Sequence, residues 1–166
     1  MKPLATTLAA LFLTLPATAQ ERVLSPEKAT GFDTLVTQCV SFTREAFANG
    51  MCAPLMQSVA ATATANGLKV LHLGRTEWGF GTDVYLRPDA KLLSPVHLTA
   101  YIRATDAPTS AFIWLSLYVP GDAGRLVLWE DSGIGAGDVG VISGGLSQGL
   151  AQKLVPVIET LGAGRP

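Results

Sequence analysis

Strict alternation of apolar and polar positions is clearest between Ser94 and Trp129, where it predicts three adjoining strands. In the first of them, over 96–104, every second residue is aliphatic, and the residues between are polar or aromatic. This period of two is typical of a strand with one buried face. Turn-forming residues at 106–109 and 120–124 separate this strand from the next two, 111–119 and 125–130.

Elsewhere the apolar spacing predicts helices. Ser25-Pro26-Glu27 has the composition of a helix start, and apolar residues then recur at helical spacing as far as Phe47. A second helix is expected over 52–65, followed by short strands at 68–73 and 83–87.

A final helix is predicted from Val139 to Leu161, with Asp138 at its N-cap and Pro156 as a potential kink. The resulting fold is an α+β two-layer domain: an N-terminal helical hairpin, an antiparallel meander of about five strands, and the C-terminal helix packed on the sheet.

The first 19 residues have the pattern of a secretory signal peptide rather than of folded structure. Met1-Lys2 is followed by an apolar run over 4–15, and Ala17 and Ala19 fit a small-residue cleavage site. The apolar run is shorter than the ~20 residues that a membrane-spanning helix needs. We therefore expect residues 1–19 to be removed and 20–166 to form one domain in the bacterial periplasm or outside the cell, with no transmembrane segment.

Charge argues against some partners. The chain has a net charge of −1, and loss of Lys2 with the signal peptide makes it −2. Nucleic acids and anionic membranes demand clustered Lys and Arg, so neither is expected as a partner. An envelope protein or a small ligand is the expected partner.

The two cysteines, Cys39 and Cys52, favour a disulfide in an oxidising compartment, with buried free thiols as the alternative. They lack the Cys-x-x-Cys spacing of a redox motif. Nothing in the spacing brings His72 or His97 to them, so no metal site and no cofactor is predicted.

The register of the hairpin between the strands predicted at 96–104 and 111–119 decides which residues share a face of the sheet. If the numbers of facing partners in the 96–104 and 111–119 strands sum to 217, aliphatic residues meet aliphatic residues. A one-residue slip would bury Arg103 and His97 on the aliphatic side, which is costly. The same reasoning assigns Leu126 and Leu128 to the aliphatic face.

The second face of the sheet would then be aromatic and polar. Its predicted members are Tyr85, Arg87, His97, Tyr101, Arg103, Phe112, Trp114, Tyr118 and Trp129. Trp, Tyr and Arg dominate binding hot spots, and an exposed aromatic patch usually has a use. The alternative is a second core layer, covered by a helix or by the loop around Trp78.

The glycine-rich segment 131–140 offers a weaker candidate. Gly135, Gly137 and Gly140 match the Gly-x-Gly-x-x-Gly pattern ahead of a helix, but no second parallel strand follows, as a dinucleotide fold requires. A small-molecule or anion site at the helix N-terminus, formed by these glycines and Asp138, remains as an alternative.

Nucleophile motifs are also weak. Ser147 stands in a Gly-x-Ser-x-Gly pattern, but inside a predicted helix rather than at a strand-to-helix turn, so close packing of glycines is the simpler explanation. Glu130-Asp131 is more typical of a strand end than of a paired-acid site. The favoured hypothesis is a non-enzymatic periplasmic binding protein, with a hydrolase-like site near 131–140 that uses Asp138, His97 or Ser147, or a purely structural envelope domain, as alternatives.

Overall fold

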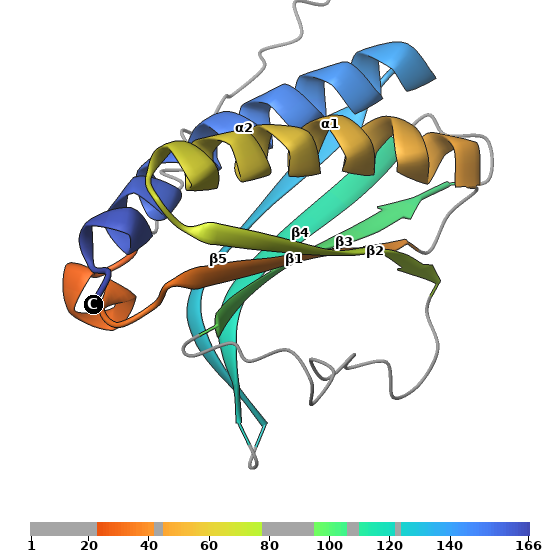
Figure 1. The fold of residues 1–166 in the computed structure, drawn as a ribbon. Helices are drawn as coiled ribbons and strands as arrows, with labels where there is room; N and C mark the ends of the chain where they lie inside the picture. The colour runs from red at the N-terminus through yellow and green to blue at the C-terminus, as the bar shows by residue number, and fades with distance from the viewer. Residues whose placement is uncertain (1–22, 42–44, 78–94, 106–109, 122–123) are drawn as a thin grey trace, which may run out of the picture.

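The fold is seen in a computed structural model that describes residues 23–41, 45–77, 95–105, 110–121 and 124–166. Its elements are η1 (Pro26–Ala29), β1 (Thr34–Ser41), α1 (Glu45–Ala65), β2 (Lys69–Glu77), β3 (Pro95–Ala104), β4 (Ser110–Gly121), β5 (Gly124–Ala136) and α2 (Val139–Ala163). The two helices lie side by side on one face of a five-stranded sheet, which gives the molecule two layers (Figure 1).

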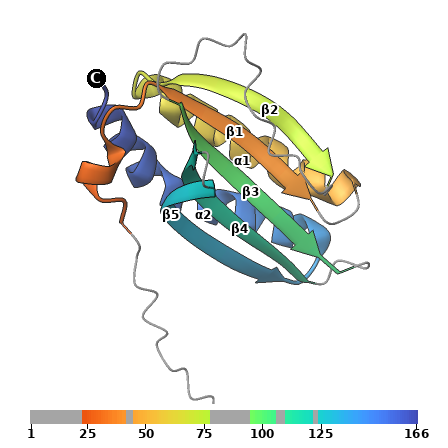
Figure 2. The ribbon, with the colours of Figure 1, turned by 90° about the horizontal axis from the view of Figure 1, so that it is seen from below.

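The sheet is mixed, with the strand order β2-β1-β3-β4-β5. The strands β2, β1 and β3 run parallel, whereas β3, β4 and β5 form antiparallel pairs. Figure 2 shows this order from the side of the sheet that faces away from the helices. The edge strands among the described residues are therefore β2 and β5.

The predicted N-terminal helical hairpin is wrong, because the segment expected to form its first helix contains the strand β1. All eight residues of β1 are buried, Thr34, Thr37, Gln38 and Ser41 included. A strand buried on both faces shows no alternation, so its apolar residues could be fitted to a helical period. The β-branched residues of the segment favour the strand that forms.

The predicted antiparallel meander is also wrong, since β1 pairs in parallel with strands on both of its sides. A parallel pair needs a crossover connection, and α1 provides it between β1 and β2. The strand predicted at 83–87 lies outside the described residues. The remaining strands match the predicted segments in kind, and two helices with a five-stranded sheet still make an α+β molecule.

The core lies between the sheet and the two helices. The aliphatic rows of β3 and β4 line it from the sheet, and α1 and α2 close it from above. Its largest fully buried side chains are Leu24, Leu35, Met51, Leu55, Leu98, Ile102, Ile113, Leu115, Leu117, Ile142, Leu154 and Ile158. Each buried aliphatic side chain contributes roughly 1.5–3 kcal/mol, so this layer is the main source of stability.

The C-terminal helix forms as predicted, with its apolar stripe in the core. Pro156 lies inside it without ending it. The glycine-rich loop predicted at 131–137 is wrong up to Ala136, because β5 continues that far. Gly133 and Gly135 are needed there: a Cβ on Gly135 would lie 3.0 Å from Leu146 of α2.

Close packing was expected at the glycines around Ser147, and this is wrong too. A Cβ on Gly144, Gly145 or Gly149 would meet nothing within 4 Å. The glycines that bring α2 close to the sheet belong to β5 and not to the helix.

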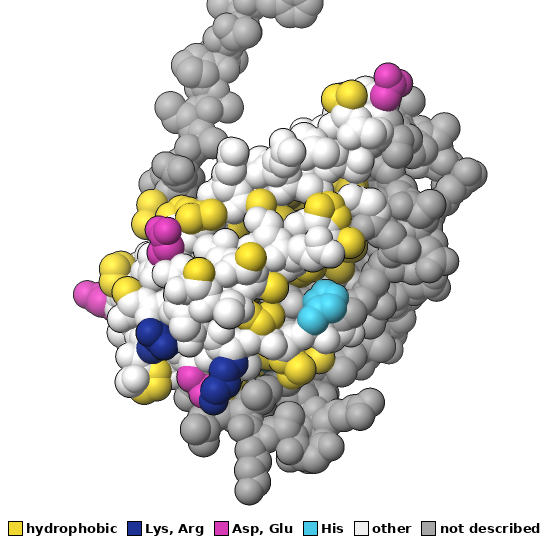
Figure 3. Space-filling model, turned by 45° about the horizontal axis from the view of Figure 1, so that its top comes forward, with side chains coloured by type: hydrophobic (Ala, Val, Ile, Leu, Met, Phe, Trp, Pro, Cys, Tyr) yellow, Lys and Arg dark blue, Asp and Glu magenta, His cyan; other side chains and the backbone are white. Residues whose placement is uncertain are grey.

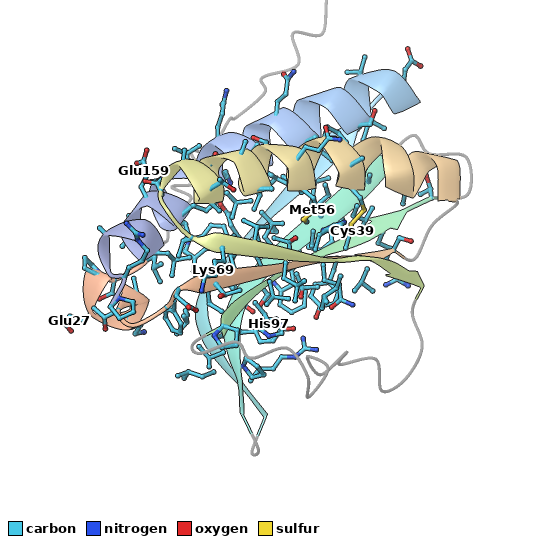
Figure 4. The ribbon with its side chains drawn as sticks, viewed as in Figure 1. Glu27, Cys39, Met56, Lys69, His97 and Glu159 are labelled. Carbon is cyan, nitrogen blue, oxygen red and sulfur yellow. A yellow bond between two sulfur atoms is a disulfide. The ribbon has the colours of Figure 1, made fainter. Side chains whose placement is uncertain are left out.

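The disulfide between Cys39 and Cys52 is confirmed, but it joins β1 to α1 rather than two helices. Both cysteines are buried in the core. Figure 4 shows Cys39 pointing from the sheet toward the helix layer, beside Met56 of α1. The bridge therefore fastens the central strand to the crossover helix above it.

Candidate aromatic binding surface on the sheet

The two faces of the β3–β4 hairpin are separated as predicted, but the partners differ. Leu98 faces Leu117 and Tyr101 faces Trp114, so the numbers of facing residues sum to 215 and not 217. A shift by two residues keeps each side chain on its face, since the strand period is two. The aliphatic row points into the core and the aromatic row points away from the helices.

The predicted face loses one of its members, because Trp129 lies on the helix side of the sheet. It is only 5% exposed and belongs to the core. The ladder between β4 and β5 has an irregularity at Leu117/Tyr118, where Trp129 and Val127 face consecutive residues of β4. Leu128 is the extra residue of this bulge, which exchanges the faces of β5 from Trp129 onward. Two other predicted members, Tyr85 and Arg87, lie outside the described residues.

One half of the face is buried and polar. His97 and Tyr118 are cross-strand partners whose rings lie 5.4 Å apart, and both are buried. The hydroxyl groups of Tyr118 and Thr99 lie 3.3 Å apart, within hydrogen-bonding distance. In Figure 4 His97 lies below the sheet, on the side opposite the helices. This half corresponds to the interpretation as a second core layer.

Arg125 joins this half of the face and was missing from the predicted set. Its guanidinium lies 4.5 Å from the centroid of the Tyr118 ring and donates a hydrogen bond to the hydroxyl of Tyr101. A cation over an aromatic face is attracted by the ring quadrupole. Arg125 faces Pro120 and comes before the bulge, so the alternation of the strand could have assigned Arg125 to this face.

The other half is exposed and forms what we call the aromatic patch: Tyr101, Arg103, Phe112, Trp114 and Ile134. Phe112, Trp114 and Ile134 are 40%, 36% and 77% exposed. Tyr101 and Trp114 stack at a ring distance of 4.9 Å, and Phe112 is flanked across the strands by Arg103 and Ile134. Ile134 was missed because it was assigned to a loop.

The residues of the predicted anion site are placed differently. Gly135 belongs to β5 and lies under Leu146, so its backbone is part of the sheet rather than of a phosphate-binding loop. Gly137 makes the turn into α2 with a φ of 129°. Asp138 is the N-cap of α2 and is exposed, and its negative charge at this end disfavours an anion. Gly140 has nothing within 4 Å of its Cβ position.

Ser147 has a structural role. Its hydroxyl is buried and donates a hydrogen bond to the backbone carbonyl of Met51, 3.2 Å away, which ties α2 to α1. Glu130 accepts a hydrogen bond from Ser116, whereas Asp131 points to the helix side and pairs with Lys153 at 2.8 Å. The two acids therefore lie on opposite faces and do not form a paired-acid site. Within the described ranges, no group of three or more His, Cys, Asp and Glu residues could hold a metal ion.

A small pocket of about 150 Å³ opens beside β5 on the helix side of the sheet. The ring of Trp129 and four apolar residues form most of its wall, and the Asp131–Lys153 ion pair completes it. The apolar residues are Val23, Leu24, Pro156 and Val157. Nothing in the sequence patterns pointed to this pocket, because its lining comes from three separate segments.

The helix layer carries few charges. From Met51 to Ala65 no residue is acidic or basic, and α2 has only Lys153 and Glu159. The space-filling view shows charged side chains near the margins of this layer (Figure 3). His72 is exposed, and its Nδ1 lies 2.9 Å from the hydroxyl of Thr37. No helix among the described residues has the length and apolar character to span a membrane.

Comparison with known proteins finds only a distant structural similarity. No protein-family model and no curated protein matches the sequence. Among solved structures the chain is similar to a PelC dodecamer from Paraburkholderia phytofirmans, with 15% identity, a TM-score of 0.42, and coverage of 77% of this chain and 89% of that one. A single-substitution variant of the same dodecamer matches with 13% identity, a TM-score of 0.43 and the same coverage. A likeness this distant carries no argument about what the present chain does.

Proposed function

We propose that this chain is an exported, non-enzymatic protein of the bacterial envelope, and that it binds another envelope protein or a ligand through the aromatic patch. The observation that carries the proposal is the exposure of Phe112, Trp114 and Ile134 side by side on one face of the sheet. Side chains of this kind are costly to leave in water and supply most of the energy of protein interfaces.

Order within the patch supports the proposal further. Trp114 is stacked on Tyr101, which in turn accepts a hydrogen bond from Arg125, so the rings are held before any partner arrives. A surface ordered in advance loses less side-chain entropy on binding. Arg103 at the margin adds a cation that can pair with a carboxylate of the partner.

Localisation outside the cytoplasm is supported by the disulfide. Cys39 and Cys52 are bridged, and structural disulfides are typical of proteins in oxidising compartments. The signal-peptide pattern of residues 1–19 leads us to propose the periplasm or the cell exterior.

The proposal is tested by capturing partners from envelope extracts with the wild-type protein and with the Phe112→Ala/Trp114→Ala variant. We expect the variant to lose specific partners that the wild type retains, because truncating hot-spot aromatics costs about 2 kcal/mol or more, roughly a thirtyfold loss of affinity. Tyr118 is left unchanged, since it is buried and its loss would disturb the fold.

The matched control is Val141→Ala. Val141 is also a strongly exposed apolar residue, but it lies on α2, away from the aromatic patch. It should leave the captured set unchanged. Identical captured sets for the wild type and the Phe112→Ala/Trp114→Ala variant would refute binding through the patch.

A further inference from the structure

We infer that the partner contributes an extended segment that adds to the edge of β5 as a sixth strand and inserts an apolar side chain into the pocket beside Trp129. This inference rests on the proposed function in that it names the kind of partner that binds next to the aromatic patch. It is carried by the edge position of β5, by the direction of its backbone groups and by the pocket on the same strand.

β5 is the longest of the described strands, and only its last five residues lack the features that protect sheet edges. It is last in the strand order, and no further strand pairs with it in the part of the chain that the structure describes (Figure 2). Natural edges are protected by Lys and Pro, by bulges and by charged side chains. The bulge and the charged residues of β5 lie before Ser132, whereas 132–136 contain none of these features and Ile134 is exposed.

Backbone geometry identifies which groups of β5 point outward. The N–H of Ser132 donates to the carboxylate of Asp131 at 2.6 Å, so it does not serve the ladder with β4. Because outward and inward pairs alternate along an antiparallel ladder, the N–H of Ile134 points to the same outer side. The N–H of Ile134 is the group that an added strand would use, because the N–H of Ser132 is already engaged by Asp131.

The pocket lies where such a strand would place a side chain. Trp129 and Asp131 of β5 both point to the helix side, and both line the pocket. A guest residue directly opposite either of them also points to that side. A volume of about 150 Å³ with mostly apolar walls suits one medium-sized apolar side chain.

Alternation then defines the chemistry of the guest. Guest residues that point to the helix side meet the pocket and should be apolar. Guest residues that point to the other side lie next to Ile134 and the aromatic patch. That other face carries Glu130 of β5 as well as Arg125, so charge alone does not select acidic or basic guest residues there. The guest is thus an extended peptide with an apolar anchor in the pocket and apolar neighbours beside Ile134.

The test selects phage-displayed random peptides on the mature, disulfide-bonded protein and measures affinities of the selected peptides by fluorescence polarisation. Selected peptides should alternate in the way described. Ile134→Pro should weaken them about tenfold, because it removes an outward N–H while keeping the ladder with β4. Ile134→Val keeps that N–H and serves as its control.

Pro156→Phe tests the pocket independently, since a bulky side chain at this exposed position on the lining would occupy it. We expect about tenfold weaker binding, whereas Pro156→Ala should bind like the wild type. This variant carries the test if Ile134→Pro fails to fold, as judged by circular dichroism.

Failure of the inference differs from failure of the proposed function. Undiminished peptide affinity in Pro156→Phe and in folded Ile134→Pro overturns strand addition, as does the absence of any enriched peptide. Self-association of the protein that Ile134→Pro abolishes overturns it in favour of a second copy as the occupant. Partner capture that is lost in Phe112→Ala/Trp114→Ala but kept in both edge variants leaves the proposed function standing alone.

Discussion

At the scale of single residues, two glycines should respond in opposite ways to the same substitution. Gly135→Ala places a methyl group 3.0 Å from Leu146 and 3.2 Å from Ile142, so we expect a loss of about 1–3 kcal/mol in the free energy of unfolding. Gly145→Ala meets nothing within 4 Å in the exposed part of α2 and should gain up to about 1 kcal/mol. Urea denaturation of both variants measures the difference. Equal stability would contradict the close approach of α2 to β5.

Trp129 and Ile134 show where the alternation of apolar and polar residues fails to predict the position of a side chain. Each strand was assigned a face by alternation, which is correct for Tyr101, Arg103 and Trp114. A bulge adds one residue without any local signature, and it reversed the face of Trp129. Ile134 was hidden by its glycine neighbours, which are typical of loops but here allow a helix to approach the strand.

At the scale of elements, the bridge between β1 and α1 should be a main source of stability. Cys39 and Cys52 are 13 positions apart, and closing a loop of that size is worth about 3 kcal/mol. The Cys39→Ala/Cys52→Ala variant should lose about that much, as measured by urea denaturation. Reducing agent should destabilise the wild type and leave the variant unchanged. A wild type indifferent to reduction would argue against the bridge.

The identity of β1 as a strand was beyond the reach of periodicity. Leu35, Val36, Cys39 and Val40 recur at a spacing that fits a helix, and the polar residues between them gave no hint that they are buried as well. α2, by contrast, has one apolar stripe and one exposed face, so its period is plain and its bounds were predicted closely. Amphipathic elements can be predicted locally, whereas fully buried ones depend on their neighbours.

At the scale of the whole molecule, the sheet order predicts a gradient of protection from hydrogen exchange. β1 lies between two strands and is buried throughout, whereas β2 and β5 are edges in the described fold. Amides of β1 should exchange at least about tenfold more slowly than those of β2 and β5 in native-state exchange. The helix that the apolar spacing predicted over this segment would have no neighbouring strands to protect its amides. The NMR or mass-spectrometric profile distinguishes the two.

The parallel topology itself could not be read from the sequence. Neighbours in the chain usually pair, and this rule is correct for β3, β4 and β5. β1, however, is inserted between β2 and β3, so its partners lie far along the chain. The aliphatic rows of β3 and β4 predict which face of each strand points into the core. They do not predict which strand pairs with the other side of β3.

The central position of β1 has a consequence for a chain that emerges N-terminus first, from a ribosome or a translocation channel. The segment 34–41 appears early, but β3, one of its two partners, follows only after more than fifty further residues. During that interval its apolar side chains can pair at most with β2, and such incomplete sheets invite aggregation. Cys52 emerges soon after Cys39, so the bridge can fasten the waiting strand to its own helix and shield it until the sheet is complete.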